Sequence, residues 1–125
     1  MKEINTFVNL YNSVWNESDA KRRREIIAEL WSEDATHCTH SLEAHGHEAI
    51  EDRVLKAYEK FVVTGGYVFK TIGVADEHHK AVRYSWAMVP RDGGMAVAAG
   101  TVFMLLDDDG RIRFDYQFTD VLQAS

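Results

Sequence analysis

Residues 95–122, MAVAAGTVFMLLDDDGRIRFDYQFTDVL, contain two runs of strand-forming residues separated by the turn signal DDDG. Two similar runs come before them, divided from each other by DEHHK and from residue 95 by PRDGG. The second half of the chain is therefore predicted to form four consecutive strands joined by tight turns, over residues 67–77, 81–89, 95–106 and 111–122.

The first half of the chain carries a helical pattern instead. Apolar residues recur at helical spacing over residues 4–15, 26–31 and 50–61, and the third run is followed by a GG pair that predicts its end. The segment ATHCTH, residues 35–40, lacks this spacing and is predicted to be a short strand. The order α-α-β-α-β-β-β-β indicates the α+β class, with a largely antiparallel sheet in a single domain over residues 1–125.

Bulk composition excludes several classes of protein. The formal net charge of −6 argues against a nucleic-acid partner, and the basic run KRRR at 21–24 is interpreted as the solvated face of a helix. No run approaches the length of apolar residues that a membrane span needs, and the first residues lack the apolar core of a signal peptide. The single cysteine, Cys38, rules out an internal disulfide and fits a reducing compartment, so a cytoplasmic location is expected.

Alternation along the predicted strands defines two faces of the sheet. Pairing the strands about PRDGG and DDDG places Val102 opposite Val82 on one side and opposite Asp115 on the other. One face then carries Tyr84, Trp86, Met88, Val102, Met104, Arg113, Asp115, Gln117 and Thr119. The other carries Val97, Ala99, Thr101, Phe103, Leu105, Ile112, Phe114, Tyr116 and Phe118.

Neither face is polar throughout, as a solvated face of an antiparallel sheet would be. Three helices cover one face of a sheet of this size. The second face needs another partner, which predicts a homodimer packed through the outer sheet face.

Four of the six histidines fall within residues 36–50, THCTHSLEAHGHEAI, which raises the hypothesis of a metal site. His37 and His40 lie three residues apart on a predicted strand, so they should point to opposite faces, with His40 away from His37. His45 and His47 flank a glycine at the start of a helix. This spacing matches no common zinc pattern, so no metal site is expected.

Several motifs together resemble the SnoaL-like branch of the nuclear transport factor 2-like superfamily. They are NESDA at 16–20, LWSEDATH at 30–37, HGHEAI at 45–50, VRYSWAMVP at 82–90 and LLDDDGRIRFDYQFTD at 105–120. The resemblance implies a curved sheet wrapped around helices as a cone, with a pocket inside and frequent dimerisation through the outer sheet face. Such proteins include polyketide cyclases, ketosteroid isomerases, dehydratases, epoxide hydrolases and non-catalytic binding modules, so the fold alone does not settle the function.

Steroid isomerase activity is not expected from the residues at the matching positions. Ketosteroid isomerase uses a carboxylate base together with a tyrosine and a protonated aspartic acid. Tyr11 matches the isomerase tyrosine in this comparison. Thr39 occupies the position of the base and Val102 that of the aspartic acid, so two of the three groups are missing.

The same comparison places His37 and Thr39 on the pocket side of their strand, and Asp115 shares that face. His37, Asp115 and Tyr11 are therefore predicted as an acid–base set, because a carboxylate can orient an imidazole and fix its tautomer. The alternatives stay open: a hydrogen-bonded core histidine, an ion pair between Asp115 and Arg113, and a core tyrosine.

The resemblance therefore implies a pocket for a small, mostly apolar organic molecule. It also implies acid–base chemistry such as cyclisation, isomerisation or dehydration, with no metal or cofactor. A non-catalytic ligand-binding or dimerisation module is the alternative. The residues expected to contact the ligand are Thr39, Tyr84, Trp86, Met88, Val102, Met104 and Gln117.

Overall fold

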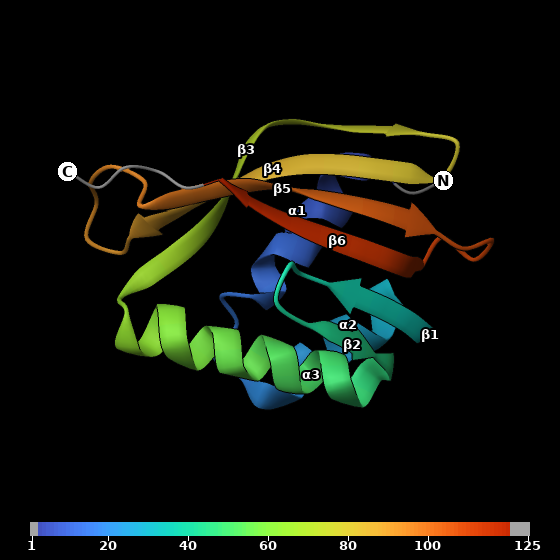
Figure 1. Cartoon of the computed structure of the whole chain (residues 1–125), viewed down its shortest axis with the longest axis horizontal. Coiled ribbons are helices and arrows are strands. Elements are labelled where there is room, and N and C mark those ends of the chain that lie inside the picture. The colour runs from blue at the N-terminus through green and yellow to red at the C-terminus, as the bar shows by residue number, and fades with distance from the viewer. Residues whose placement is uncertain (1–2, 121–125) are drawn as a thin grey trace.

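The computed structural model describes residues 3–120, which form three helices and one six-stranded sheet (Figure 1). The predicted α+β class and the order of the predicted elements are confirmed. One short strand, β2, was not predicted, and the third helix continues as a π-helical turn, η1. The elements are α1 (Ile4–Val14), α2 (Ala20–Leu30), β1 (Trp31–Cys38), β2 (Glu43–His45), α3 (Gly46–Ala57), η1 (Tyr58–Thr64), β3 (Tyr67–His78), β4 (Ala81–Pro90), β5 (Ala98–Leu106) and β6 (Ile112–Asp120).

The sheet is open and curved, with the strand order β2-β1-β6-β5-β4-β3. All neighbouring strands are antiparallel except β1 and β6, which run parallel. This parallel pair brings together segments that lie far apart in the sequence. Its register sets His37 directly beside Asp115, so both side chains project from the same face.

The registers of the last three strands differ by two residues from the prediction. Val82 pairs with Met104 rather than Val102, and Asp115 also pairs with Met104. Between β4 and β5 the reason is that β4 continues to Pro90 and β5 begins only at Ala98, so the connection is longer than PRDGG. Between β5 and β6 the shift goes with the irregular register at Leu105 and Leu106. A shift of two residues preserves the alternation, so the predicted faces remain largely the same.

The start of β6 is an exception to those faces. The register between β5 and β6 is irregular at Leu105 and Leu106, and Ile112 pairs with Leu106. Ile112 therefore turns into the core, where it is fully buried, instead of lying on the outer face as predicted. Arg113 correspondingly leaves the inner face, and its guanidinium contacts Asp34.

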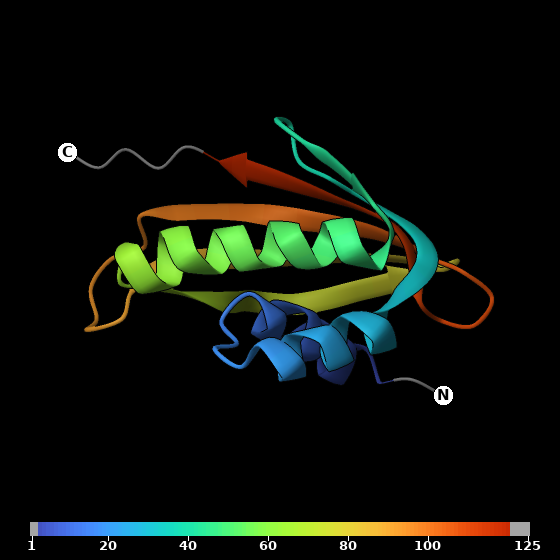
Figure 2. The same ribbon diagram turned by 90° about the horizontal axis from the view of Figure 1, so that it is seen from below.

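The three helices all pack against the inner face of the sheet, and α3 runs along its concave side (Figure 2). Tyr84, Val102 and Met104 belong to the resulting core. Helix α2 begins at Ala20 and is capped by Asp19, whose carboxylate accepts a hydrogen bond from the backbone of Lys21.

The outer face of the sheet has no helix over it (Figures 1 and 2). Large apolar side chains are exposed there, with 36% of Phe103, 36% of Leu105 and 59% of Phe118 accessible. No helix in the described part of the chain combines the length and the apolar composition needed to cross a membrane.

Candidate functional site

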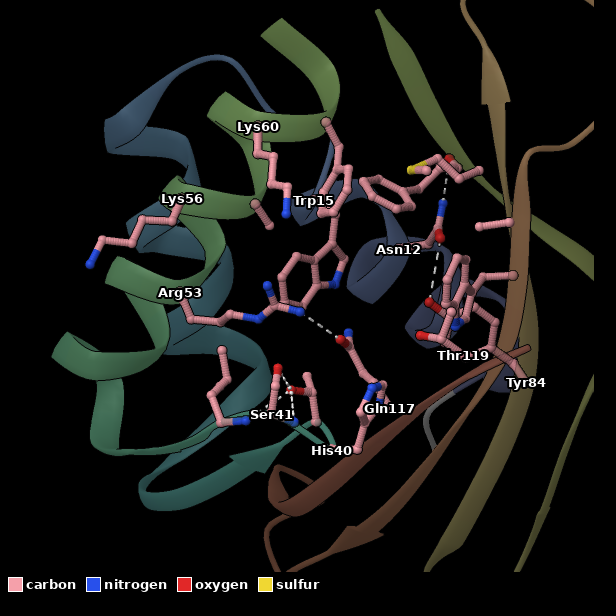
Figure 3. Close-up of a pocket in the computed structure, with 18 residues that line it drawn as sticks. Asn12, Trp15, His40, Ser41, Arg53, Lys56, Lys60, Tyr84, Gln117 and Thr119 are labelled. Atoms are coloured by element: carbon pink, nitrogen blue, oxygen red, sulfur yellow. Dashed lines mark hydrogen bonds between the residues drawn. The ribbon is translucent and has the colours of Figure 1, made fainter. Parts of the chain in front are cut away.

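A cavity of about 440 Å³ opens between α3–η1, the end of α1 and the inner face of β4, β5 and β6 (Figure 3). Its volume suits a small organic molecule. The turn after β1 borders it. The residues that line it are Asn12, Trp15, Thr39, His40, Ser41, Leu42, Arg53, Lys56, Ala57, Lys60, Phe61, Phe69, Tyr84, Trp86, Met88, Ala98, Gln117 and Thr119.

Five of the seven residues expected to contact a ligand lie in the cavity wall, namely Thr39, Tyr84, Trp86, Met88 and Gln117. The other two, Val102 and Met104, are fully buried in the core and do not border the cavity, which corrects the expectation for them. They belong to the part of the sheet over which α1 and α2 pack, so helix side chains cover them.

Other residues of the wall were not predicted. Arg53 lies on α3 three residues after Ile50 and four before Ala57, so the helical spacing puts it on the inward side. That signal was available in the sequence. His40 was expected to face away, yet it lines the cavity, because β1 ends at Cys38 and strand alternation does not extend to residue 40.

Behind the wall lies a buried carboxylate, Asp115, with three hydrogen-bond donors around it. The hydroxyl of Tyr11 donates to Oδ2 at 2.7 Å, and the indole N–H of Trp31 donates to Oδ1 at 2.9 Å. Nδ1 of His37 lies 2.7 Å from Oδ2. The predicted contact between His37 and Asp115 is confirmed, while the alternative pairing of Asp115 with Arg113 is wrong.

These contacts assign a tautomer to His37. Asp115 accepts, so Nδ1 of His37 carries the proton and donates it. The Nε–H of Arg53 points at Nε2 of His37 over 3.4 Å, which requires a lone pair on Nε2. His37 is therefore held with its basic nitrogen toward Arg53, on the side of the cavity, although its own side chain is fully buried and does not line the wall.

Tyr11 is fully buried and has no donor left for a ligand. Its one hydroxyl proton goes to Asp115, and its oxygen accepts a hydrogen bond from Nε2 of Gln117 at 3.1 Å. Burial is the main cause that raises the pKa of Tyr11 well above its ordinary value, and the charge of Asp115 raises this pKa further. Tyr11 therefore positions Asp115 instead of reaching into the cavity.

Arg53 separates the buried network from the cavity, and Figure 3 shows its guanidinium reaching from α3 toward Gln117. One terminal nitrogen donates to Oε1 of Gln117 at 3.1 Å, and the guanidinium carbon lies 5.3 Å from the ring centroid of Trp15. Burial lowers the pKa of the Arg53 guanidinium, whereas Tyr11 and Asp115 act in the opposite direction.

The remaining two histidines of the cluster form local contacts. Nε2 of His47 lies 2.7 Å from the carbonyl oxygen of Trp31, and Nδ1 of His45 lies 3.1 Å from the hydroxyl of Thr36. No three His, Cys, Asp or Glu side chains between residues 3 and 120 are placed to hold a metal ion together.

Comparison with solved structures identifies the class of protein. A "putative isomerase of the SnoaL-like family" from Agrobacterium tumefaciens str. C58 is 32% identical, over 96% of this chain and 99% of that one, with a TM-score of 0.86. The chain therefore belongs to the SnoaL-like family. No family sequence model matches the chain, and no curated protein matches it either.

Two more distant structures share the fold. An NTF2-like protein of unknown function from Exiguobacterium sp. 255-15 is 22% identical, over 91% of this chain and 98% of that one, with a TM-score of 0.67. A "putative polyketide cyclase" from Sinorhizobium meliloti is 18% identical, over 90% of this chain and 94% of that one, with a TM-score of 0.69.

Proposed function

We propose that the cavity binds a small, mostly apolar organic molecule, and that His37 moves a proton of that molecule in a cofactor-free acid–base reaction. The reaction class is cyclisation, isomerisation or dehydration, each of which begins with removal of a proton next to a carbonyl group. The names of the Agrobacterium and Sinorhizobium structures, an isomerase and a polyketide cyclase, are consistent with that class.

The observation that carries this proposal is the 2.7 Å contact between Nδ1 of His37 and the fully buried Asp115. The carboxylate fixes the tautomer and stabilises the imidazolium that forms when Nε2 takes a proton. Asp115 is fully buried, accepts three hydrogen bonds and does not line the cavity, so its role is to position His37. Tyr11 and Trp31 hold Asp115 in turn.

A substrate reaches Nε2 only if Arg53 turns aside. Its contact with His37 is long, at 3.4 Å, and its side chain has several rotatable bonds, so the movement requires mainly that the hydrogen bond to Gln117 and the contact with the Trp15 ring be released. In the proposed reaction Arg53 swings toward the bound molecule, uncovers Nε2 and then lies beside the oxygen on which negative charge develops.

A non-catalytic ligand-binding module is the second candidate. The observation that favours it is the complete burial of His37, which contributes no atom to the cavity wall. In that case the network around Asp115 only supports the wall, and a bound molecule leaves unchanged.

The test is exchange of α-protons into D₂O, followed by proton NMR, on a panel of bicyclic and aromatic ketones of the tetralone type. We expect the protein to accelerate exchange of at least one ketone by about 10²-fold or more, which is typical of general-base catalysis. In His37→Asn, which keeps a donor toward Asp115 but has no counterpart of Nε2, the rate should fall to that of buffer.

His78→Gln is the matched control, because His78 is exposed at the end of β3 and far from the cavity wall. It should exchange the ketone at the rate of the unmodified protein. Exchange that survives in His37→Asn would refute the catalytic assignment, and a ketone that binds without any exchange would support the binding module.

The assembly and the location of the protein are further proposals. The exposed apolar side chains of the outer sheet face support a homodimer formed through that face. The single cysteine, which excludes an internal disulfide, supports a cytoplasmic location.

A further inference from the structure

The charged residues of the cavity wall all have the same sign. Arg53, Lys56 and Lys60 line the cavity, and none of its lining residues is an aspartate or a glutamate. The whole chain nevertheless has a formal net charge of −6. The cavity is therefore a locally positive site in an acidic protein, and such a site favours an anion.

Two of these three cations point inward. Figure 3 shows the side chains of Arg53 and Lys60 directed into the cavity, whereas Lys56 extends away from it. Lys56 is already neutralised by Asp52, with 2.9 Å between Nζ and Oδ2. Lys60 packs over the ring of Phe61 at 5.1 Å and forms no ion pair with any residue in the range 3–120.

Arg53 is partly buried, yet its hydrogen bonds go only to neutral partners. They are Nε2 of His37 and Oε1 of Gln117, and no carboxylate within residues 3–120 lies in ion-pair contact with it. A charge that has lost part of its hydration is stabilised by a partner of opposite sign. The nearest buried carboxylate, Asp115, is already taken by its three donors.

Several hydrogen-bond donors of the wall have no acceptor among residues 3–120. Among residues 3–120, two of the five N–H groups of the guanidinium have acceptors. The indole N–H groups of Trp15 and Trp86, two further residues of the wall, are buried without any acceptor among residues 3–120. Buried donors without acceptors are rare, and a ligand rich in acceptor oxygens would complement this wall.

The part of the wall that β3 and β4 contribute is apolar and aromatic. Phe69 packs edge-on against Trp86, with 5.9 Å between the ring centroids, and Met88 lies on the same strand as Trp86. A bound molecule would therefore meet cations from α3 and η1 and rings from β3 and β4.

We propose that the ligand is an aromatic or alicyclic carboxylate, whose carboxylate group binds between Arg53 and Lys60 while its rings pack against Phe69, Trp86 and Met88. This inference rests on the proposal that the cavity binds an organic molecule, and it names the chemical class of that molecule. A guanidinium suits a carboxylate because it can donate two parallel hydrogen bonds.

The test compares acids with their neutral amides, for example 2-naphthoate with 2-naphthamide and benzoate with benzamide, by isothermal titration calorimetry. We expect at least one acid to bind about ten-fold tighter than its amide or better, a difference that corresponds to one ion pair partly shielded from water. In Arg53→Gln this preference should disappear, whereas Arg53→Lys should keep most of it.

Arg24→Gln is the matched control, because it removes the same charge from the exposed side of α2, where Arg24 contacts Glu51. It should keep the preference for the acid, and thermal melting should show that all variants are folded. Lys60→Gln gives a second measurement, with a weakened preference expected, if Arg53→Gln does not fold.

The outcomes separate this inference from the proposed function. Equal or tighter binding of the amides would overturn the inference and leave the cavity as a site for neutral molecules. An acid preference that persists in both Arg53→Gln and Lys60→Gln would also overturn it. Failure of every acid and amide to bind would overturn the inference alone, because the proposed function is tested separately by exchange of the ketones.

Discussion

Asp115 is the residue on which the candidate site depends, because it is a fully buried carboxylate held by three hydrogen-bond donors. Three hydrogen bonds offset the cost of removing its charge from water, but only if all three donors stay in place. Tyr11 lies on α1, while Trp31 and His37 both lie on β1, so the carboxylate on β6 links α1, β1 and β6.

Replacement of Asp115 by asparagine should therefore be costly, although the two side chains have nearly the same shape. The NH₂ group of asparagine would face one of the three existing donors, and the negative charge of the carboxylate would be lost. We expect a loss of about 2–4 kcal/mol in the free energy of unfolding, measured with urea. Asp76→Asn, which affects an exposed ion pair with Arg83, should cost under about 0.5 kcal/mol. Similar losses in the two variants would contradict this account of Asp115.

The buried tyrosines predict a loss of stability at high pH. Burial is the first cause that raises the pKa values of Tyr11 and Tyr84, with a further contribution from Asp115. Above about pH 10 a tyrosine ionises in the unfolded chain but stays protonated in the folded one, so the native state binds more protons and stability falls as pH rises.

Urea unfolding between about pH 9 and pH 11.5 measures this effect, which is at most about 1.4 kcal/mol per pH unit for each tyrosine. Tyr11→Phe loses the hydrogen bond to Asp115 at every pH. Its free energy of unfolding should nevertheless fall less steeply with pH, because one tyrosine fewer loses a proton on unfolding. Equal slopes for the unmodified protein and for Tyr11→Phe would show that Tyr11 ionises as readily in the folded state.

At the scale of elements, the pattern of apolar residues predicts all three helices and the four long strands, because each has a clear period. Two features escape such a pattern. β2 has only three residues, Glu43–His45, too few to show a period. The irregular pairing that turns Ile112 inward depends on the geometry of the turn before β6, which alternation cannot reveal.

The pairing of β1 with β6 lies further beyond sequence reasoning. Turn signals pair only strands that are neighbours in the sequence, whereas these two are separated by most of the chain. The contact between His37 and Asp115 was predicted because the family resemblance placed both on one face. Arg53 could have been predicted from helical spacing, but its position between His37 and the cavity depends on how α3 crosses the sheet.

Gly100 shapes the curved sheet at the cavity. It pairs with Trp86 on β4 and Thr119 on β6, and a Cβ atom there would lie 1.9 Å from the carbonyl oxygen of Phe118 and 2.7 Å from Cζ2 of Trp86. Glycine thus allows the Trp86 ring to lie against the strand and form part of the wall.

We expect Gly100→Ala to lower the free energy of unfolding by about 1–3 kcal/mol, since strand and ring must both move. The displaced Trp86 should also weaken binding of any acid or ketone that occupies the cavity. Gly66→Ala is a useful contrast, because a Cβ atom there meets nothing within 4 Å, although its φ of +74° adds backbone strain. Unchanged ligand affinity in Gly100→Ala, as judged by calorimetry, would argue that Trp86 takes no part in binding.

For the whole molecule, the main feature is the contrast between the two faces of the sheet. The helices bury the inner face, while Phe103, Leu105 and Phe118 remain exposed on the outer one. The face sets follow from alternation alone and, apart from Ile112 and Arg113 at the start of β6, survive the two-residue shift in register. The occupant of the outer face does not follow from the fold of one chain, and the homodimer stays a prediction.

This prediction is checked by size-exclusion chromatography with light scattering at micromolar concentration, where a dimer is expected. Phe118→Asp should shift the protein to monomer, because a charge on the apolar face opposes its burial. Val63→Asp should leave the dimer intact, since Val63 is an exposed apolar residue on η1. A monomer for the unmodified protein would exclude the sheet-to-sheet dimer.

The tautomer of His37 is the most direct test of the candidate site, because the proposed chemistry requires a lone pair on Nε2. Long-range ¹⁵N–¹H correlation spectra of the imidazole rings report which nitrogen carries the proton, and His37→Asn assigns the signal. We predict that neutral His37 is protonated on Nδ1, as its contacts with Asp115 and Arg53 require. A signal showing the proton on Nε2 would contradict the assignment of His37 as the base.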